Sequence, residues 1–544
     1  MTAPVRVLCL GGGYVATQLS RTLRRAVRRG EIELTVVSRE NFQTFHGFVN
    51  EMLTGKLQPG QIINPARHIF PPARFLNAEI TGIDTERRRV TTTRLLDGRE
   101  YALDYDHLVI ALGSADDLSR YPGIAQHTLR LKTYWDCFKA RNHLVHMLEM
   151  AELETDPEER RRLLTFVVAG GNFGGIEVAT ELADWLQSII GTHREYRHID
   201  ARDARVIVVH GGERILPEMG RHHPRLVEYA ERVLTATPGL EIRCGTHVAA
   251  ATPDEVVLRS GERIPTRTTI SCTGTAMPPV LADLPFARDD RGRIITDEYL
   301  RVTGADRVWA AGDCAAVPHP RGGTCPPLFA YALSGGRQIA RNILRSRGSK
   351  PLARYRFTGL GDACSLGRRR AVATLAGVPT TFTGLPAWLG WRALGLSFVP
   401  TWDRRVRIAL DWLLWPLFGR DVVGLRIDEP FGMRREYYEV GQSIVREGET
   451  GTRLYFILAG EVDVVRATSD GEQHLAILTS GQHFGERAVL GNVRRTATVR
   501  ARTPLEVVVL GRDEALTLGG TVAAFGDSIR ALPTPVEGDR QRLS

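Results

Sequence analysis

Val5-Arg-Val-Leu-Cys-Leu10, followed at once by Gly11-Gly-Gly13-Tyr-Val-Ala16, predicts a buried strand that ends in a glycine turn and a helix N-terminus. The helical pattern runs to about Arg29, and the next strand is predicted from Ile32 to Ser38. A βαβ unit with this G-x-G-x-x-A spacing lets the backbone approach a pyrophosphate at the helix N-terminus. The opening stretch therefore predicts a dinucleotide-binding domain.

The motif also assigns the cofactor contacts of this first unit. We expect contacts from four residues of the turn: Gly11, Gly13, Tyr14 and Ala16. An acidic residue usually ends the second strand and binds a ribose, but Ser38 holds that place here. Arg39 and Glu40 follow and complete the candidate contacts, with Glu40 as the substitute acid.

A second copy of the pattern begins with a predicted strand at 164–169. Gly170-Gly-Asn-Phe-Gly-Gly175-Ile-Glu177 opens a helix predicted through Trp185, and another strand is predicted at 205–209. The same reasoning assigns nucleotide contacts to Gly170, Gly171, Phe173 and Gly175. Asn172 stands where the middle glycine belongs, so its Cβ would crowd a close pyrophosphate. His210 replaces the expected ribose acid, which leaves the choice between NADH and NADPH open.

A third motif, Arg307-Val-Trp-Ala-Ala-Gly312-Asp313, is an apolar strand ending in Gly-Asp. An aspartate there can accept a hydrogen bond from a ribityl hydroxyl, and the following helix N-terminus faces the flavin. In this order, the three motifs resemble the flavoproteins with two dinucleotide-binding domains. One Rossmann domain of that group holds FAD, and a second, inserted within it, holds the nicotinamide cofactor. The resemblance implies FAD and NAD(P)H, with further contacts from Lys132, Gly274, Gly312 and Asp313.

The seven cysteines form no Cys-x-x-Cys or similarly close pair, so neither a redox disulfide nor a metal site is indicated. From Val5 to about Arg426 the chain resembles the type II NADH dehydrogenases. The stretches that carry this resemblance are Ser38-Arg-Glu-Asn-Phe-Gln-Thr-Phe45, Tyr105-Asp-His-Leu-Val-Ile-Ala-Leu-Gly-Ser114, Leu131-Lys132-Thr133, Gly212-Glu-Arg-Ile-Leu-Pro217 and Ser365-Leu-Gly-Arg-Arg-Arg-Ala-Val-Ala373.

The resemblance implies hydride transfer from the nicotinamide to the flavin, and then reduction of a quinone. Glu177 matches a glutamate that would lie near the flavin and relay protons; the alternative is a helix-start carboxylate favoured by the helix dipole. The acceptor pocket falls on Phe329, Ala330 and Tyr331. The family usually has two glutamines in this segment, and Ala330 and Gly335 replace them here. Phe329 and Tyr331 therefore form either an aromatic wall or core.

Residues 385–425 contain five of the eight tryptophans, at 388, 391, 402, 412 and 415. The apolar run from Ile408 to Phe418 is interrupted by Asp411 and Pro416, and is too short to span a bilayer. Arginines flank it at 404, 405, 407 and 420, and residues 350–426 contain twelve Lys or Arg and four Asp. This composition predicts a helix lying in the membrane interface. The alternatives are an amphipathic core or dimer helix, or a generally arginine-rich chain.

From Phe431 the pattern changes to short β-rich runs separated by glycines, as in a small β-barrel or jelly roll. Residues 431–530 resemble the cyclic-nucleotide-binding domain. The ligand contacts implied are Gly485, Glu486, Arg487, Ala488, Arg495 and Thr496. Glu486 can accept from a ribose hydroxyl, and Arg495 can pair with the cyclic phosphate of cAMP or cGMP. No helix-turn-helix follows Arg530, so a nucleic-acid partner is not expected.

A chain of 544 residues is too long to fold around a single hydrophobic core. Its composition, 43% hydrophobic and 24% charged residues, is typical of globular proteins. The predicted class is α/β with two Rossmann-like domains, a membrane-interface segment and a C-terminal β-barrel. The expected ranges are 1–160 and 276–348 for the FAD domain, 161–275 for the NAD(P) domain, 349–428 for the membrane-interface region, 429–531 for the nucleotide domain and 532–544 for a tail.

No signal peptide is apparent, so we expect a cytoplasmic protein that is peripheral on the inner face of the cell membrane. The leading hypothesis is an NAD(P)H dehydrogenase tuned by a cyclic nucleotide. One alternative is a sensor of redox state and cyclic nucleotide with little turnover. Another is a soluble reductase with a non-quinone acceptor. The acceptor, the choice of cyclic nucleotide and a homodimeric state are left open.

Overall fold

The computed structural model describes residues 3–192, 196–425, 434–449, 451, 453–468, 471–486, 489, 494–511 and 514. They form two compact units. The first joins residues 1–117, 129–246 and 270–424, and the second joins residues 118–128, 247–269 and 425–544.

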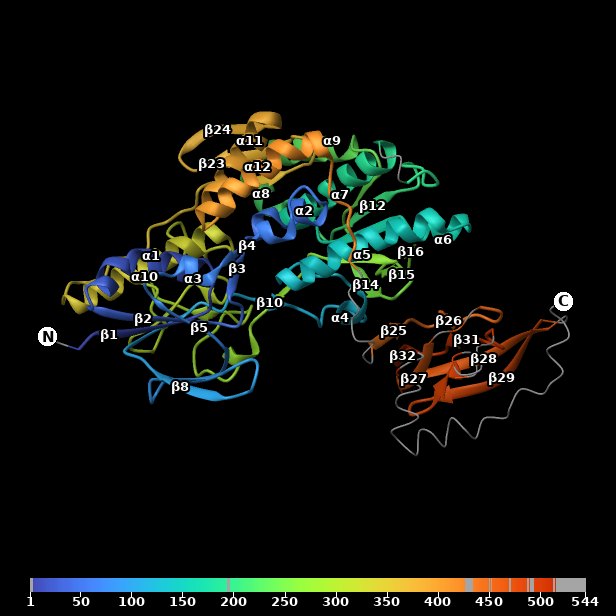
Figure 1. Cartoon of the computed structure of the whole chain (residues 1–544), viewed down its shortest axis with the longest axis horizontal. Helices are drawn as coiled ribbons and strands as arrows, with labels where there is room; N and C mark the ends of the chain where they lie inside the picture. Colours follow the sequence, from blue (N-terminus) through green and yellow to red (C-terminus); the bar gives the residue numbers. More distant parts are fainter. Residues whose placement is uncertain are drawn as a thin grey trace. The chain divides into compact units, whose positions relative to one another are not determined.

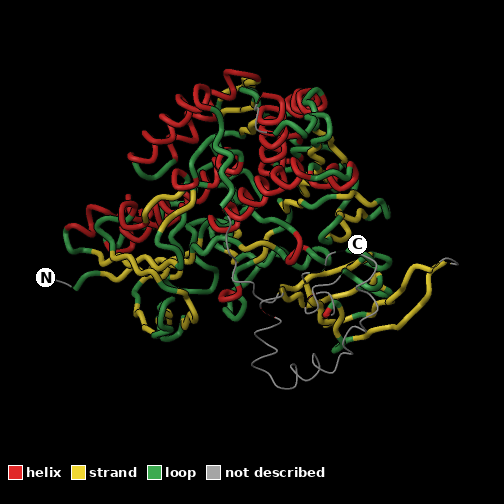
Figure 2. Tube along the Cα trace, turned by 45° about the vertical axis from the view of Figure 1, so that its right-hand side comes forward, coloured by secondary structure: helices red, strands yellow, loops and turns green. Residues whose placement is uncertain are grey.

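The first dinucleotide-binding sheet has five parallel strands in the order β20-β9-β1-β2-β5. Its strands are β1 (Val5–Leu10), β2 (Ile32–Ser38), β5 (Arg74–Asn77), β9 (His107–Ile110) and β20 (Val308–Ala310). Helices α1 (Tyr14–Arg28) and α10 (Phe329–Arg347) lie together on one face of this sheet (Figures 1 and 2). They cross closely because position 336 is glycine, where a Cβ would lie 2.2 Å from the Val15 carbonyl oxygen.

The second sheet has the order β13-β12-β11-β17. Its strands are β11 (Thr165–Ala169), β12 (Arg205–Val209), β13 (Leu240–Arg243) and β17 (Thr268–Ser271). Helix α7 (Phe173–Thr192) follows β11 and extends beyond the predicted end at Trp185, because Leu186 and Ile189 continue its buried face. Helices α5 (Tyr134–Leu153) and α9 (Pro224–Thr235) belong to the same region. The predicted α/β class with two dinucleotide-binding sheets is confirmed.

The second sheet is an insertion within the first fold. Strands β10 (Ala115–Asp116) and β18 (Thr275–Ala276) pair antiparallel where the chain leaves the first sheet and where it returns. The remaining short elements of the first unit are β3 (Phe42–Thr44), α2 (Val49–Leu53), β4 (Ile63–Pro65), α3 (Ala66–Ile69), β6 (Glu79–Asp84), β7 (Arg89–Thr93), β8 (Glu100–Asp104), α6 (Pro157–Leu163), α8 (Pro217–Gly220), β19 (Ile294–Ile295) and β21 (Ala315–Ala316).

The last part of the first unit is a small sheet with two helices. The sheet contains β22 (Ala363–Ser365), β23 (Ala371–Leu375) and β24 (Val378–Thr383), and the helices are α11 (Gly384–Phe398) and α12 (Trp402–Phe418). The segment predicted as one helical stretch is thus two helices, separated at Val399–Thr401 where Pro400 cannot donate a helical hydrogen bond. Among the described residues, no helix has the length and apolar character needed to cross a bilayer.

The second unit contains two four-stranded antiparallel sheets, β25-β32-β27-β30 and β26-β31-β28-β29. Their strands are β25 (Arg434–Tyr438), β26 (Ser443–Val445), β27 (Arg453–Ala459), β28 (Glu461–Thr468), β29 (Gly471–Thr479), β30 (His483–Phe484), β31 (Thr498–Ala501) and β32 (Leu505–Gly511). Alternate residues of β32 point into a shared core with Tyr455 and Phe484. The unit also includes α4 (Ile124–His127), β14 (Val248–Ala251), β15 (Glu255–Leu258) and β16 (Arg263–Pro265).

Candidate functional site

The first glycine turn is tight at one end and open at the other. Gly11 has φ of +106°, and a Cβ there would lie 2.2 Å from the Ala111 carbonyl oxygen. A Cβ at Gly13 would meet no atom within 4 Å. The turn therefore packs against β9 while leaving space at the N-terminus of α1, as a pyrophosphate requires. Ala16 is buried beneath this turn.

Three residues from separate loops meet near this turn. The Ser114 hydroxyl donates to Asp313 Oδ2 at 3.0 Å and accepts from Lys132 Nζ at 2.8 Å. Lys132 Nζ lies 3.6 Å from Asp313 Oδ2. Gly312, with φ of +82°, turns the chain between β20 and Asp313. The structure thus brings together two predicted cofactor contacts, Lys132 and Asp313.

Tyr14 is held by residues that the motif did not indicate. Its hydroxyl donates to the Thr44 carbonyl at 3.5 Å and accepts from the His46 amide at 3.4 Å. His46 Nε2 lies 2.8 Å from the Lys132 carbonyl and donates to it. Burial raises the pKa of Tyr14 and lowers that of His46, so both side chains are neutral at pH 7.

Arg39 and Glu40 are exposed at the end of β2, beside the turn. Arg39 Nε lies 3.4 Å from Glu79 Oε2, and Asn77 Nδ2 donates to the Ser38 and Arg39 carbonyls at 3.2 and 2.5 Å. A Cβ at Gly12 would lie 2.9 Å from Ser38 Oγ, which places the serine directly under the turn.

The second glycine turn has comparable geometry. A Cβ at Gly175 would lie 1.9 Å from the Gly170 carbonyl oxygen, so glycine alone allows α7 to start this close to β11. Asn172 is exposed, and Phe173 is half-buried at the start of α7. Gly274, with φ of +74°, lies between β17 and β18.

His210 directly follows β12, and its ring lies against the turn. His210 Nδ1 accepts a hydrogen bond of 3.3 Å from the Gly171 amide. A Cβ at Gly171 would lie 2.8 Å from the imidazole Cγ atom. The position that normally presents a carboxylate to a ribose therefore presents an imidazole whose Nδ1 is an acceptor.

Glu177 lies in the second turn of α7 and contacts the C-terminal part of the first unit. Its Oε1 atom accepts a 3.0 Å hydrogen bond from the Ser365 amide. Burial raises the pKa of Glu177 to about 8, opposed by hydrogen bonds from the Ser365 amide and the Trp391 side chain. The carboxyl group is therefore mostly protonated at pH 7.

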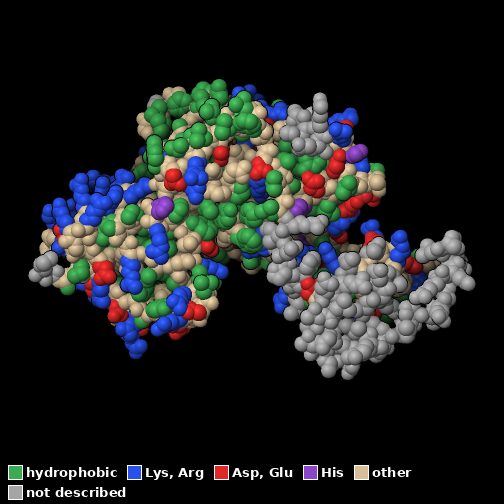
Figure 3. Space-filling model, in the orientation of Figure 1, with side chains coloured by type: hydrophobic (Ala, Val, Ile, Leu, Met, Phe, Trp, Pro, Cys, Tyr) green, Lys and Arg blue, Asp and Glu red, His purple; other side chains and the backbone are tan. Residues whose placement is uncertain are grey.

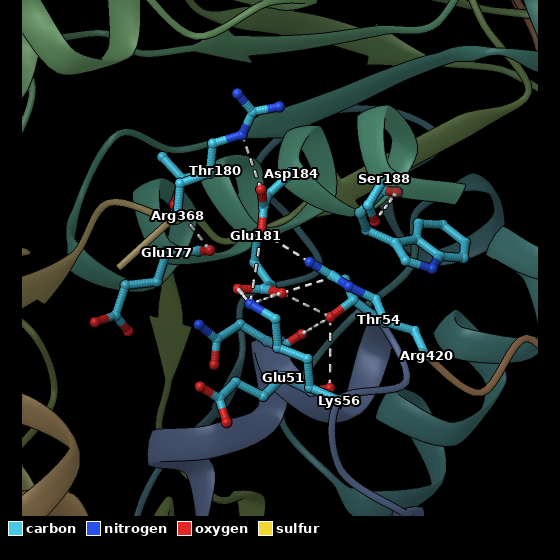
Figure 4. A network of polar contacts seen from close by, with 12 residues as sticks. Glu51, Thr54, Lys56, Glu177, Thr180, Glu181, Asp184, Ser188, Arg368 and Arg420 are labelled. Atoms are coloured by element: carbon cyan, nitrogen blue, oxygen red, sulfur yellow. Dashed lines mark hydrogen bonds and ion pairs between the residues drawn. The ribbon is translucent and has the colours of Figure 1, made fainter. Parts of the chain in front are cut away.

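A buried ion cluster follows on the next turns of α7, while Glu177 points away from it (Figure 4). Glu181 Oε1 lies 2.7 Å from Lys56 Nζ and 2.9 Å from Arg420 Nη1, and it accepts a 2.9 Å hydrogen bond from Thr54. Asp184 pairs with Arg420 at 2.7 Å and Arg368 at 3.0 Å. Arg420, one of the four arginines that flank the predicted interfacial run, is buried in this cluster and is therefore not available to lipid headgroups.

Trp388 and Trp412 of the predicted interfacial segment also face the protein. Arg392 lies 4.2 Å from the Trp388 ring centroid and 4.3 Å from that of Trp412. Arg392 Nη2 and Trp412 Nε1 donate to the two carboxylate oxygens of Glu51, at 2.5 and 2.6 Å.

Other apolar side chains of this segment are solvent-exposed. Trp402 is 75% exposed, Leu417 76% and Phe418 81%. Figure 3 shows hydrophobic side chains gathered over the region that Figure 1 labels β24, α11 and α12. We call the exposed members of α11 and α12 the apolar patch: Leu385, Leu389, Leu394, Trp402, Val406, Leu410, Leu413, Leu414, Leu417 and Phe418.

The segment predicted to line the acceptor pocket begins α10. The Phe329 ring contacts that of Phe398 at 4.7 Å and lies 6.0 Å from that of Tyr14. The Tyr331 hydroxyl lies 3.3 Å from His319 Nε2, and Ala330 is half-buried between the two aromatic residues. A Cβ at Gly335 would lie 2.9 Å from the Ala311 Cβ, so a longer side chain does not fit there in this structure.

In the second unit, Arg495 is 7% exposed and its guanidinium donates to two carbonyls. Nη1 donates to Gly485 and Nη2 to Arg453, each at 2.8 Å. Within the described residues, Glu486 Oε2 is buried without a hydrogen-bond partner. Thr496 is exposed, and its carbonyl accepts from Arg466 Nε at 3.2 Å. The predicted contacts Arg487 and Ala488 lie outside the described residues.

Comparisons with known proteins match two parts of the chain. Residues 4–336 match the family described as pyridine nucleotide-disulphide oxidoreductase, and residues 435–519 match the cyclic nucleotide-binding domain. The type II NADH:quinone oxidoreductase Ndh of Mycobacterium tuberculosis is 26% identical over 421 residues, covering 75% of this chain and 87% of that protein. Demethylphylloquinone reductase NdbB of Synechocystis is 28% identical, covering 76% and 96%. NDH2 of Plasmodium falciparum, solved in complex with NADH, shares the fold with a TM-score of 0.70, 16% identity and coverage of 77% and 99%.

Proposed function

The chain belongs to the pyridine nucleotide-disulphide oxidoreductase family, and we propose on this basis that it is an FAD-dependent NAD(P)H dehydrogenase that reduces a quinone. Its relatives include a type II NADH:quinone oxidoreductase and a demethylphylloquinone reductase. All seven cysteines, which lie within the described residues, are free. Electrons therefore pass to an external acceptor without an internal disulfide.

The observation that carries this proposal is the meeting of Lys132, Ser114 and Asp313 beside the open end of the first glycine turn. These groups suit FAD, because the turn would hold its pyrophosphate and Asp313 would accept from a ribityl hydroxyl. Bound FAD would supply the two-electron redox chemistry. The second turn, from Gly170 to Gly175, would hold the nicotinamide dinucleotide.

Glu177 is the proposed proton donor. With a pKa raised to about 8 by burial, its carboxyl group holds a proton at neutral pH. A group with a pKa near the working pH is suited to general acid–base catalysis. Reduction of a quinone to a quinol takes up two protons, and Glu177 would deliver one of them.

Phe329, Phe398 and Tyr14 support an aromatic acceptor site. The Phe329 ring, in the segment where the family usually carries glutamine, lies 6.0 Å from the Tyr14 ring and 4.7 Å from the Phe398 ring. Flat aromatic rings of this kind pack well against a quinone ring. We propose that an aromatic wall replaces the polar contacts of the missing glutamines.

The apolar patch supports attachment to the inner face of the cell membrane. It presents leucines together with Trp402, the residue type that favours the membrane interface. Helices α11 and α12 would lie in the interface plane and deliver a membrane quinone to the site.

In the second unit, Arg495 and Glu486 support binding of cAMP or cGMP that regulates turnover.

The decisive experiment adds NADH anaerobically to the purified flavoprotein, and then a short-chain quinone, while flavin absorbance is followed. The proposal expects bleaching with NADH and recovery with quinone. Recovery only with a non-quinone acceptor would instead support the soluble reductase. A flavin that neither NADH nor NADPH bleaches would contradict the dehydrogenase and favour the sensor, for which Asn172 and His210 are the supporting departures.

A further inference from the structure

The nucleotide domain shares a compact unit with a short connection of the dehydrogenase. Residues 118–128 cluster with residues 247–269 and with the C-terminal domain. They lie between β10 and α5, so they belong to one of the two covalent crossings between the dinucleotide-binding sheets. We call residues 118–128 the connection segment.

The connection segment packs tightly against β14. The Ala251 amide donates to the Pro122 carbonyl at 3.0 Å. Gly123 has φ of +76°, and a Cβ there would lie 1.7 Å from the Ala251 carbonyl oxygen. Because backbone packs directly on backbone, a displacement of one of these elements displaces the other.

The edge strand of the nucleotide domain contacts this assembly. The Tyr437 amide in β25 donates to His127 Nε2 at 2.7 Å. Next to it, Gln442 Nε2 donates to Thr252 Oγ1 at 2.8 Å, and Arg263 donates to the Val440 carbonyl at 3.3 Å. Burial lowers the pKa of His127 to about 4, so at pH 7 the ring is neutral and Nε2 is a genuine acceptor.

Glu436 lies between this contact and Arg453, the residue that contacts Arg495. It is buried in β25 beside Tyr437, and its Oε1 atom lies 3.6 Å from Arg453 Nη1. Its Oε2 atom accepts a 2.7 Å hydrogen bond from the Tyr438 hydroxyl. The backbone carbonyl of Arg453 in turn accepts from Arg495, the predicted phosphate ligand.

A cyclic phosphate must compete for the Arg495 donors that now bond to carbonyls. Charge-assisted hydrogen bonds to an anion are stronger than bonds to neutral carbonyls. Binding would therefore release the Arg453 carbonyl, at the start of β27, and change the position of the side chain that faces Glu436. The strand order β25-β32-β27 joins these residues within one sheet.

We propose that the cyclic nucleotide controls the dehydrogenase through the connection segment. The hydrogen bond between Tyr437 and His127 transmits the change from the cyclic-nucleotide-binding domain to this segment. This inference rests on the proposed nucleotide binding and NADH oxidation. The proposed structural change passes from Arg495 through Arg453 and Glu436 to His127. Because the connection segment lies at a crossing between the FAD and NAD sheets, its displacement changes how the nicotinamide dinucleotide is held.

The test measures the Kd of cAMP and of cGMP on the full-length flavoprotein by calorimetry, with and without saturating NAD⁺. Coupling between binding sites is reciprocal. If the cyclic nucleotide changes the affinity for NAD⁺ by some factor, NAD⁺ changes the affinity for the cyclic nucleotide by the same factor. We expect a change of about fivefold or more in the wild type. His127→Phe removes the acceptor and should bring the ratio to about one while nucleotide affinity without NAD⁺ is kept.

Two variants distinguish loss of the Tyr437–His127 hydrogen bond from a general loss of structure. His127→Gln retains an acceptor oxygen and should keep most of the coupling. His68→Phe, at an exposed position of α3, is the matched control and should keep all of it. A melting curve establishes that each variant is folded, and Gln442→Leu should weaken the coupling if His127→Phe does not fold.

If the coupling between NAD⁺ and the cyclic nucleotide is unchanged in folded His127→Phe, the proposed role of the Tyr437–His127 hydrogen bond is overturned. A wild type that binds both ligands without mutual effect would overturn it as well. A wild type that binds neither cAMP nor cGMP would contradict the nucleotide site itself, and one that binds a cyclic nucleotide but not NAD⁺ would contradict the dehydrogenase. These failures are distinguishable in one set of titrations.

Discussion

The Glu177 carboxyl accepts a 3.0 Å hydrogen bond from the Ser365 amide, which ties the helix of the second glycine turn to strand β22. The chain between α7 and β22 is long, so only the folded first unit brings these residues together. The contact leaves a protonatable oxygen in a desolvated environment, and burial is the main reason that the pKa of Glu177 rises to about 8.

The first prediction concerns the pH dependence of quinone reduction. Glu177 is protonated below about pH 8 and loses its proton as the pH rises through that value. If it donates a proton to the acceptor, kcat should fall above about pH 8 in the wild type. Glu177→Gln should lower kcat by about 10²-fold or more and remove this limb, because the amide does not titrate. Steady-state assays from pH 6 to about 10 check this.

The control for this variant is the first half-reaction. NADH should still bleach the flavin of Glu177→Gln at close to the wild-type rate, because hydride transfer needs no proton from this carboxyl. An unchanged alkaline limb in the variant would assign the titration to another group, and Glu177 would then be a structural carboxyl.

A second prediction concerns the buried ion cluster. Arg420→Met leaves Glu181 and Asp184 with one cation fewer, and removing one partner of a buried pair costs about 3–5 kcal/mol. Urea unfolding followed by flavin release should show this loss. Arg202→Met is the control, since Arg202 pairs with Asp200 at an exposed position and should leave the unfolding midpoint unchanged. Equal midpoints for the two variants would mean that the cluster does not hold the C-terminal part of the first unit.

A third prediction addresses the choice of nicotinamide cofactor. A carboxylate at the end of β12 would hydrogen-bond a ribose 2′-hydroxyl and repel a 2′-phosphate, whereas His210 does not repel it. The wild type should therefore bind NAD⁺ and NADP⁺ with affinities within about tenfold, a difference below about 1.4 kcal/mol. His210→Glu should weaken NADP⁺ by at least about tenfold more than NAD⁺.

His210→Gln serves as the uncharged control for this experiment and should keep the wild-type preference. Calorimetric titration of each variant gives both constants without turnover. A wild type that already rejects NADP⁺ would show that another residue makes the selection.

Much of the α/β fold could be predicted because its signals are local. Strands β1, β2 and β12 have the predicted bounds, since buried parallel strands are nearly continuous apolar runs that end at glycine or polar residues. The ion cluster could not be predicted. Lys56, Glu181 and Arg420 come from distant segments, and no periodicity marks residues that meet only after folding.

The tryptophans show the same limit in another way. Their number in residues 385–425 indicates an amphipathic segment, but composition does not tell which face is covered. Glu51 decides this for Trp412, because its carboxylate accepts the indole N–H and turns the ring toward the protein. The exposed face consequently consists mainly of leucines, with Trp402 as its exposed indole.

The fourth prediction follows from that exposed face. Replacing Leu413, Leu417 and Phe418 together by serine should abolish sedimentation with lipid vesicles, since each buried large apolar side chain contributes about 1.5–3 kcal/mol. The matched control replaces Leu96, Met150 and Leu153, which are also exposed but lie outside the apolar patch. Turnover with a water-soluble short-chain quinone should be unchanged in both triple variants, whereas turnover with a long-chain quinone in vesicles should fall only in the first. If vesicle binding survives the first triple change, the apolar patch serves another role, and sedimentation equilibrium of the same variant would show whether it joins two copies of the chain.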